Sequence, residues 1–177
     1  WSRYRTSYAT RLKDRIPELS KMAMLSEVGF DDLIKANEKS FYVENVFMSN
    51  NDFFDIFDFP IRQGTALLNE ENKAVITESL AKQYFNDESP IGKVIEVDGT
   101  GSFEVTAIAA DPPADSRIQF KLLLSNLPEL REAAERFADS GGSVVSAYVL
   151  LPENVSIESV QAKVDQLMLD EWPEDAL

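Results

Sequence analysis

The stretch KVIEVDGTGSFEVTAIAA (residues 93–110) contains two runs in which apolar and polar residues alternate, separated by the turn sequence DGTG at 98–101. Alternation with a period of two on both sides of a glycine turn predicts a β-hairpin. The G-x-G of Gly99 and Gly101 does not indicate a dinucleotide site, because a strand and not a helix follows it. An antiparallel hairpin in the middle of the chain favours an α+β fold over a doubly wound parallel sheet.

The segments on either side of this hairpin continue a mixed order of helices and strands. Apolar residues recur every four positions in 4–15, and Pro17 is expected to end that helix. Thr77 is a natural N-cap for a helix that follows a short strand at 74–76. The other predicted elements are a strand at 21–29, a hairpin at 31–49, a helix-to-strand segment at 51–64, an irregular loop at 111–117, a strand at 118–125, a helix at 127–138, a strand at 143–151 and a helix at 156–172.

The segment NDFFDIFDFPIRQG (residues 51–64) interleaves phenylalanines with aspartates. Phe53 and Phe57 have helical spacing, and the period then changes to two at Phe59. This pattern predicts core positions for these three rings and places the aspartates in water. Phe54 fits the buried stripe least well and is the candidate for an exposed contact. If Phe57 is buried as predicted, its replacement by alanine is expected to cost roughly 3–5 kcal/mol of stability.

The composition excludes several classes of function. The chain of 177 residues is 44% hydrophobic, which is enough for one large domain or two small ones with a real core. Its net charge of −14 argues against binding to nucleic acid and against adsorption to anionic membranes, since both need a basic surface. The chain has no cysteine and no histidine, which excludes disulfides, thiol nucleophiles, cysteine-ligated metals and a Ser-His triad.

Short patterns that resemble catalytic or ligand sites lack the residues that such sites need. SPIGK (89–93) is not a phosphate-binding loop, because Asp87 stands where that loop has a glycine and Val94 where it has a hydroxyl. The aspartates among the phenylalanines lack the glycine and the glutamate of a calcium-binding EF-hand loop. The many carboxylates have no recognisable catalytic context. The residues therefore predict no enzyme activity, no metal and no bound cofactor.

The chain begins at Trp1 and not at methionine, so we interpret it as a piece of a longer protein. No run approaches the roughly 18 consecutive apolar residues of a membrane span. The opening WSRYR (1–5) places aromatic residues beside arginines. That composition is found at membrane–water interfaces and also at the start of ordinary amphipathic helices.

Several dispersed motifs between residues 16 and 126 occur together in a known family. They are an acid before paired phenylalanines with a following F-x-F-P and glycine (Asp52, Phe53, Phe54, Phe57, Phe59, Pro60, Gly64), a strand entering a helix (Val75, Ile76, Thr77, Glu78, Ala81, Tyr84, Phe85), a P-I-G-K turn (Pro90 to Lys93) and a strand leading to a D-x-P loop (Phe103 to Pro113). In these motifs the chain resembles the MacB-like periplasmic core domain, which is found in permeases of MacB/FtsX/LolCDE-type ABC transporters. Arg117 departs from the family pattern, in which a histidine is common at that position.

The resemblance implies a fold and a set of motif residues. The fold is α+β with two lobes: a porter-like α/β lobe formed by 1–50 plus 114–177, and an inserted, mainly β, Sabre-like lobe formed by 51–113. No catalytic, cofactor-binding or metal residue is implied, and no ligand-binding residue is identified. The family-motif positions, which are implied to be mostly structural, are Phe53, Phe54, Phe57, Gly64, Thr77, Ala81, Phe85, Pro90, Gly92 and Lys93.

The resemblance also implies a place and a role. The domain would lie in the periplasm, between the first and second transmembrane helices of an inner-membrane permease. A separate cytoplasmic domain or subunit would bind and hydrolyse ATP. The periplasmic domain would couple that hydrolysis to conformational change for export or for the handling of lipoproteins or peptides. The expected partners are this ATPase, a second permease copy or paralogue and, as an open alternative, a periplasmic adaptor, with no nucleic acid.

Two other functions stay open on the sequence. An extracytoplasmic sensor or adaptor module would bind a peptide or lipoprotein, for example on a sheet edge. A carboxylate-dependent hydrolase would need a concave pocket with two convergent carboxylates. No residue indicates which cargo is transported.

Overall fold

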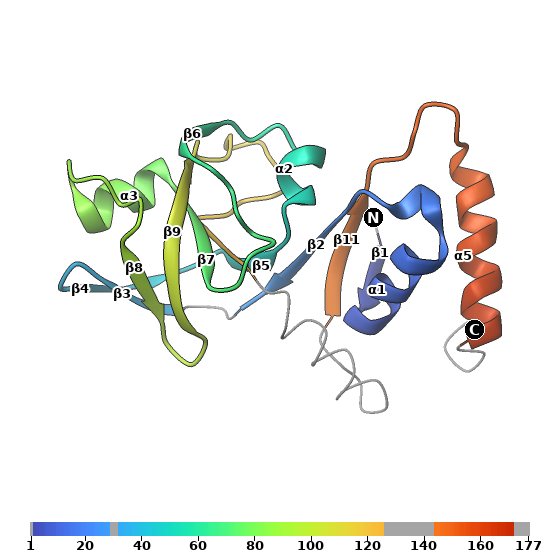
Figure 1. Cartoon of the computed structure of the whole chain (residues 1–177), viewed down its shortest axis with the longest axis horizontal. Coiled ribbons are helices and arrows are strands. Elements are labelled where there is room, and N and C mark those ends of the chain that lie inside the picture. Colours follow the sequence, from blue (N-terminus) through green and yellow to red (C-terminus); the bar gives the residue numbers. More distant parts are fainter. Residues whose placement is uncertain (1, 29–31, 126–143, 172–177) are drawn as a thin grey trace.

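The computed structural model describes residues 2–28, 32–125 and 144–171 (Figure 1). The strands are β1 (Ser2–Arg5), β2 (Met22–Glu27), β3 (Asp32–Ala36), β4 (Lys39–Val43), β5 (Val46–Ser49), β6 (Ile61–Gly64), β7 (Lys73–Thr77), β8 (Val94–Val97), β9 (Gly101–Ala109), β10 (Leu122–Ser125) and β11 (Val144–Val149). The helices are α1 (Thr6–Arg15), the short 3₁₀ helix η1 (Pro17–Leu19), α2 (Asp52–Ile56), α3 (Glu78–Phe85) and α5 (Ile157–Glu171). The predicted helix at 127–138 lies outside the described residues.

The described strands form one 11-stranded sheet in the order β1-β11-β2-β5-β10-β7-β9-β8-β3-β4, with β6 paired to β9 beside this path. The pairs β5–β10 and β7–β9 are parallel, whereas β2–β5 and β8–β9 are among the antiparallel pairs. A mixed sheet with few helices is the α+β fold that the hairpin predicted. β11 lies between β1 and β2, so strands from the two ends of the chain are neighbours.

Two predicted hairpins occur in the middle of the chain. β8 and β9 pair around residues 98–100, with Val97 opposite Gly101. β3 and β4 pair around Asn37 and Glu38, whose φ angles of 49° and 61° form the tight turn. The alternating sequence pattern therefore located the β8–β9 turn correctly and predicted a hairpin where β3 and β4 pair.

The predicted hairpin at 31–49 is wrong in its last part, where β5 forms a separate strand. Asn45 has a φ of 62° and turns the chain after β4. β5 then pairs with β2 and β10. Alternation indicates a strand without specifying its neighbours, so the local pattern did not reveal this change of partner.

Helix α1 begins at Thr6 and not at Tyr4 as predicted. Ser2–Arg5 instead form β1, in which Tyr4 lies opposite Val145 of β11. The helix prediction fails there because the strand partner lies at the other end of the sequence. As predicted, the helix ends before Pro17, which opens η1.

The predicted helix at 156–172 is present as α5. Ser156 caps its first turn, because its hydroxyl oxygen accepts a hydrogen bond from the backbone N–H of Ser159 at 3.2 Å. The predicted apolar face packs against α1, with Val160 and Val164 buried.

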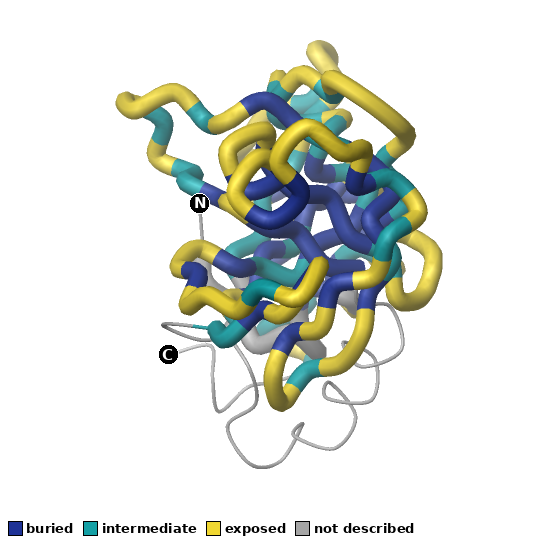
Figure 2. The backbone as a smooth tube through the Cα atoms, turned by 90° about the vertical axis from the view of Figure 1, so that its left-hand side faces the viewer, coloured by how far each residue is buried: buried dark blue, intermediate teal, exposed yellow. Residues whose placement is uncertain are grey.

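Three hydrophobic cores lie against the sheet. The α3 core includes Ile34, Val46, Ile76, Leu80, Tyr84, Phe85, Ile95, Phe103, Val105, Leu122 and Leu124. The α1–α5 core includes Ala9, Leu12, Ile16, Leu19, Met22, Val160 and Val164. The aromatic core includes Ala23, Leu25, Phe53, Leu68, Val75, Phe120 and Leu123. Seen from the α3 end (Figure 2), buried segments gather in the interior, and α3 presents both buried and exposed residues.

Alternation along the strands assigns the cores to opposite faces of the sheet. Leu123 of β10 belongs to the aromatic core, whereas Leu122 and Leu124 belong to the α3 core. In β11, Tyr148 packs against the aromatic core, while Ala147 and Val149 pack against the α1–α5 core. The aromatic core therefore lies on the sheet face opposite to all three longer helices.

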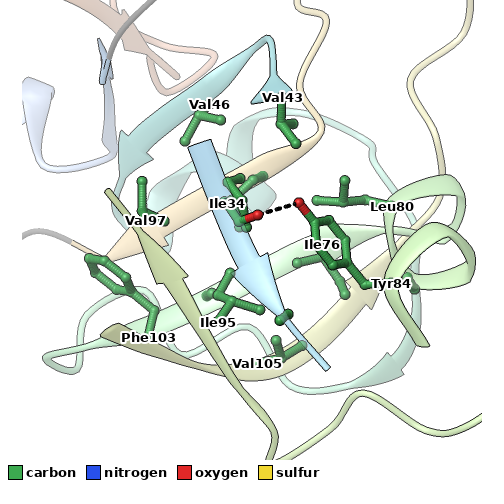
Figure 3. Close-up of a cluster of buried hydrophobic side chains, with 14 of the residues drawn as sticks. Ile34, Val43, Val46, Ile76, Leu80, Tyr84, Ile95, Val97, Phe103 and Val105 are labelled. Atoms are coloured by element: carbon green, nitrogen blue, oxygen red, sulfur yellow. Dashed lines mark hydrogen bonds between the residues drawn. The ribbon is translucent and has the colours of Figure 1, made fainter. Parts of the chain in front are cut away.

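Tyr84 is a buried member of the α3 core and contacts strand β3 (Figure 3). Its ring is 1% exposed, and its hydroxyl donates a hydrogen bond of 2.8 Å to the carbonyl oxygen of Ile34 in β3. Burial raises the pKa of Tyr84 to about 12, because the phenolate would lose its hydration. The contact ties α3 to the β3–β4 hairpin.

We expect the protein to lose stability between about pH 10 and about pH 12 because of Tyr84. The unfolded chain releases the phenol proton near pH 10, whereas the folded protein holds it up to about 12. The stabilisation is therefore complete below pH 10 and is lost as pH rises through this window, by about 2–3 kcal/mol in total. Urea unfolding at about pH 9 and about pH 11.5 should show a larger loss for the wild type than for Tyr84→Phe.

Tyr42→Phe is the matched control, because the Tyr42 side chain is 72% exposed. This variant should follow the wild type at both pH values. The same pH dependence in all three proteins would show that the burial of Tyr84 does not govern its titration.

Candidate functional site

A cavity of about 930 Å³ lies beside the aromatic core. Leu25 of β2, Phe47 of β5 and Tyr148 of β11 line it from the sheet. The segment after α2 contributes Phe57 and Phe59, and the loop between β9 and β10 contributes residues 116–119. Small-ligand sites usually measure about 300–1,000 Å³ and combine apolar walls with a few polar groups. The size and lining of this cavity make it the candidate functional site.

Phe53 positions the aromatic wall of the cavity. Its ring is fully buried and stacks on Phe59 at 5.5 Å between ring centroids. Phe57 lies 5.1 Å from Phe53 and makes an edge-to-face contact, also at 5.1 Å, with Tyr148 of β11. Phe120 packs edge-on against Phe53 and Phe59 at 5.4 and 5.2 Å. These contacts hold rings from three separate segments in one cluster.

The core prediction for NDFFDIFDFPIRQG is right for Phe53 but must be corrected for two other rings. Phe57 and Phe59 are half-buried, and each lines the cavity with part of its surface. Phe54, the candidate for an exposed contact, is half-buried, and its ring packs edge-to-face against Phe53 at 5.1 Å. Helical spacing identifies the face of a helix that turns inward, but it does not reveal that a cavity lies beyond that face.

The prediction that the aspartates of this segment lie in water is wrong for Asp52. Its carboxylate accepts a hydrogen bond of 2.6 Å from Lys13 Nζ and another of 3.1 Å from the backbone N–H of Met22. Asp52 therefore ties α2 to α1 and to the start of β2. Asp55 forms an exposed ion pair with Lys21 at 2.9 Å, and their hydrogen bond raises the pKa of Lys21.

We expect Asp52→Ala to cost about 1–3 kcal/mol of stability, because it leaves the N–H of the buried Met22 without its carboxylate acceptor. Asp55→Ala is the matched control and should cost less than about 1 kcal/mol, since both partners of its ion pair are about half exposed. Urea denaturation of the two variants measures the difference. Equal losses would contradict the anchoring role of Asp52.

The loop at 111–117 is irregular, as its two prolines predicted, and it is held by its own hydrogen bonds. The irregular backbone continues to residue 121, because β10 begins at Leu122 and not at 118 as predicted. Gln119 Nε2 donates to the carbonyl oxygens of Pro113 at 2.7 Å and Ser116 at 2.8 Å. The Ser116 hydroxyl oxygen accepts from the N–H of Ile118 at 3.2 Å. Asp111 accepts a 2.6 Å hydrogen bond from the hydroxyl of Ser79, at the start of α3. The loop is thus fixed at both ends while it borders the cavity.

Two charged side chains, Glu27 and Arg117, line the cavity, and both are exposed. Reasoning from the sequence did not identify either of them as a site residue. The only sequence signal was that Arg117 departs from the family pattern. Its position beside the aromatic wall depends on how the loop packs, which no local motif describes.

Three of the predicted motif residues form α3 and its packing, away from the cavity. Thr77 is the N-cap, and its hydroxyl oxygen accepts from the N–H of Leu80 at 3.4 Å. Ala81 and Phe85 are buried in the α3 core.

Four further motif residues lie around the turns that flank β6 and β8. They are Gly64, Pro90, Gly92 and Lys93. Gly64 and Gly92 have φ angles of 77° and 81°, a region that favours glycine. Lys93 Nζ lies 5.3 Å from the centroid of the Phe85 ring. Lys93 also pairs with Glu88, and this hydrogen bond lowers the pKa of Glu88. Pro90 is buried.

Within residues 2–28, 32–125 and 144–171, no group of three or more acids is arranged to hold a metal ion. Among the same residues, no helix has both the length and the apolar character needed to cross a membrane. The cavity lining contains a single carboxylate, that of Glu27, among the described residues.

The model of one domain family matches most of the chain. The family model described as MacB-like periplasmic core domain matches residues 2–167. The chain belongs to this family. The match confirms the resemblance that the dispersed motifs indicated. No curated protein shows significant sequence similarity to the chain.

Solved structures share the fold of this MacB-like domain. The periplasmic region of MacB from Actinobacillus actinomycetemcomitans has a TM-score of 0.70 at 19% identity, over 94% of this chain and 73% of that one. A domain of a putative permease from Porphyromonas gingivalis has a TM-score of 0.77 at 19% identity, over 99% and 81%. The extracellular domain of the noncanonic ABC-type transporter YknZ from Gram-positive bacteria has a TM-score of 0.64 at 14% identity, over 95% and 83%. At these identities the likeness shows the fold.

Family membership makes the chain the extracytoplasmic domain of a MacB-like ABC transporter permease. The domain is a non-catalytic part of the permease. An ATPase and the other components of the transporter are therefore its general partners.

Proposed function

We propose that this domain transmits the motion driven by cytoplasmic ATP hydrolysis to the far side of the membrane, for export or for the handling of lipoproteins or peptides. The observation that supports this role is the packing of the first and last helices into one body. Glu171 of α5 pairs with Arg11 at 3.2 Å and with Arg15 at 3.5 Å. A displacement applied to either helix would therefore move both.

Further contacts support this coupling between α1 and α5. Lys163 of α5 pairs with Glu18 of η1, and the hydrogen bond lowers the pKa of Glu18. Beneath these polar contacts, Leu12 and Ile16 share a buried cluster with Val160 and Val164. The exposed ion pairs are individually weak, so the buried cluster supplies most of the cohesion.

The sheet offers a route from these helices to the opposite end of the domain. β11 pairs with β1 and β2, β2 with β5, and β5 with β10, so backbone hydrogen bonds run from strand to strand across the sheet. The path continues through β7, β9 and β8 to the β3–β4 hairpin. The link between β2 and β5 comprises two residue pairs, Ser26 with Met48 and Glu27 with Phe47, so a displacement of β11 and β2 would reach the rest of the sheet through these residues.

We propose the two-lobe division that the family resemblance implies, with the porter-like lobe in 1–50 plus 114–177 and the Sabre-like lobe in 51–113. We change that division in one place: the β3–β4 hairpin, which lies within 1–50, is assigned to the inserted lobe. Its pairing with β8 and the hydrogen bond from Tyr84 to Ile34 support this assignment.

The proposed setting is an inner-membrane permease in which the domain follows the first of four spans and precedes the second. Its partners would be the ATPase, a second permease copy or paralogue, and a periplasmic adaptor. The domain would bind no cofactor, since ATP would occupy the separate ATPase. Most of the ten family-motif residues would maintain the fold.

A distance measurement in the assembled transporter tests the coupling. Asp98→Cys introduces a labelling site at the exposed tip of the β8–β9 hairpin, and this chain has no other cysteine. In a full-length permease without other cysteines, assembled with its ATPase, spin labels report the distance between the two permease copies. We expect that distance to differ between the ATP-bound state and the state after hydrolysis.

A second labelled pair within one domain serves as the control. Asp98→Cys combined with Glu44→Cys places labels next to the ends of β8 and β4, the two strands on either side of β3, and this distance should stay constant in both nucleotide states. If the distance between copies is also constant in both states, the proposed transmission is wrong.

The cavity favours a second candidate, a module that binds a ligand outside the membrane. A hydrolase is not favoured, because it would need two convergent carboxylates and the described lining has only Glu27.

A further inference from the structure

We infer that the aromatic-walled cavity binds a single-chain amphiphile with a carboxylate head, with the apolar chain against Phe57, Phe59 and Tyr148 and the head at Arg117. The inference goes beyond the proposed coupling role and does not depend on it. The observation behind it is that one cavity lining contains both accessible aromatic rings and an exposed arginine.

The aromatic side of the cavity offers a site for an apolar chain. Phe57 contacts Tyr148 at 5.1 Å and Phe59 at 6.2 Å between ring centroids, so the three rings form a continuous wall. Each of these side chains is only half-buried, and so is Phe47 on the same lining. Aromatic surface that remains accessible in a cavity gains stability when an apolar ligand replaces water.

Arg117 gives the cavity a positive group without a competing partner. The guanidinium makes no ion pair with any residue in the described part of the chain. By contrast, Lys13, Lys73 and Arg62 each pair with a carboxylate. In a chain with a net charge of −14, an unpaired arginine beside an aromatic wall is available to a ligand anion. The planar fork of arginine matches a carboxylate through two parallel hydrogen bonds.

The loop that carries Arg117 is held in place before any ligand arrives. The two hydrogen bonds of Gln119 to Pro113 and Ser116 close the loop around it. A fixed backbone lowers the entropy that is lost on binding.

The strand pairing favours an amphiphile over an extended peptide. A peptide that joins a sheet needs a free strand edge to satisfy its backbone groups. Each of the three strands that line the cavity lies between two other strands and none is an outer strand of the sheet: β11 lies between β1 and β2, β2 pairs with β11 at residues 22–25 and with β5 at residues 26–27, and β5 lies between β2 and β10. An acyl chain has no backbone amides and requires no such edge.

Glu27 is the second charged group on the lining, and it provides an internal comparison. Its charge opposes that of the proposed ligand head. Removal of the Glu27 charge should therefore leave carboxylate binding unchanged or make it tighter, whereas removal of the Arg117 charge should weaken it.

Titration calorimetry with dodecanoate, below its micellar concentration, tests the inference on the 177-residue chain. We expect one dodecanoate per chain, and weaker binding of octanoate because its chain covers less of the aromatic wall. Dodecyltrimethylammonium, which has the same chain length and a cationic head, should bind at least about tenfold more weakly. Equal binding of the anionic and cationic probes, or no dodecanoate binding at all, would overturn the inference.

Three charge-neutralising variants complete the test. Arg117→Gln should weaken dodecanoate binding by about tenfold, and Glu27→Gln should not weaken it. Lys121→Gln is the matched control, because Lys121 is also exposed and follows the same loop but does not line the cavity. It should bind like the wild type. Circular dichroism checks that both variants are folded. If the folded Arg117→Gln and Lys121→Gln variants bind dodecanoate with equal affinity, the head group does not bind at Arg117 and the inference is wrong.

Discussion

Phe53→Ala is expected to lower the free energy of unfolding by roughly 3–5 kcal/mol. The Phe53 side chain is 0% exposed and lies at the centre of the aromatic core. Its ring contacts those of Phe57, Phe59 and Phe120 at centroid distances between 5.1 and 5.5 Å. The substitution would remove the shared neighbour of all these rings and leave a cavity that they fill only in part. Urea unfolding measures the loss.

Phe57→Ala is the matched comparison and corrects the expectation from the sequence. Because Phe57 is half-buried against the cavity, its loss should be smaller, roughly 1–2 kcal/mol. Equal effects of the two substitutions would show that Phe57 belongs fully to the core. The comparison therefore separates the packed side of the aromatic cluster from the side that lines the cavity.

Gly64→Ala is expected to destabilise the protein by about 3 kcal/mol or more. A Cβ at this position would lie 2.1 Å from the carbonyl oxygen of Thr106 in β9, and a backbone atom has little freedom to move away. The φ of 77° adds about 1–2 kcal/mol for a left-handed conformation. β6 would have to separate from β9 to accept the methyl group. The midpoint of urea unfolding should fall accordingly.

Gly92→Ala isolates the steric part of this effect. Gly92 has a similar φ of 81°, but no atom lies within 4 Å of the added Cβ. Its substitution should therefore cost only about 1–2 kcal/mol. If the two alanine variants lost the same stability, contact with Thr106 would contribute nothing, and conformational strain alone would explain the requirement for Gly64.

The features that the sequence predicted well are those that depend on neighbours along the chain. Thr77 caps α3, and the DGTG turn joins β8 to β9, because hydroxyl caps and glycine turns act over a few residues. Pro17 ends α1 for a similar local reason. The dispersed family motifs added the domain family, which no single motif would have indicated.

The features that the sequence did not reveal depend on partners far along the chain. Tyr4 lies in strand β1 because β1 pairs with β11. β5 was predicted to belong to a hairpin with the preceding strand, but it pairs with β2 and β10. The candidate site is non-local in the same way. Phe57, Tyr148 and Arg117 meet only after the sheet and the loop are in place, so their separate patterns could not show a shared cavity.

The place of β11 between β1 and β2 determines when the sheet can be completed during biogenesis. A chain that leaves the ribosome or crosses a membrane with its N-terminus first presents residues 2–27 long before residues 144–149. Until β11 arrives, β1 has no neighbour, and β2 has an open edge that can pair with other chains. Such distant pairing slows folding. β11, the last of the described strands, therefore closes the sheet, and until it pairs, the nascent domain presents an open strand edge to other chains.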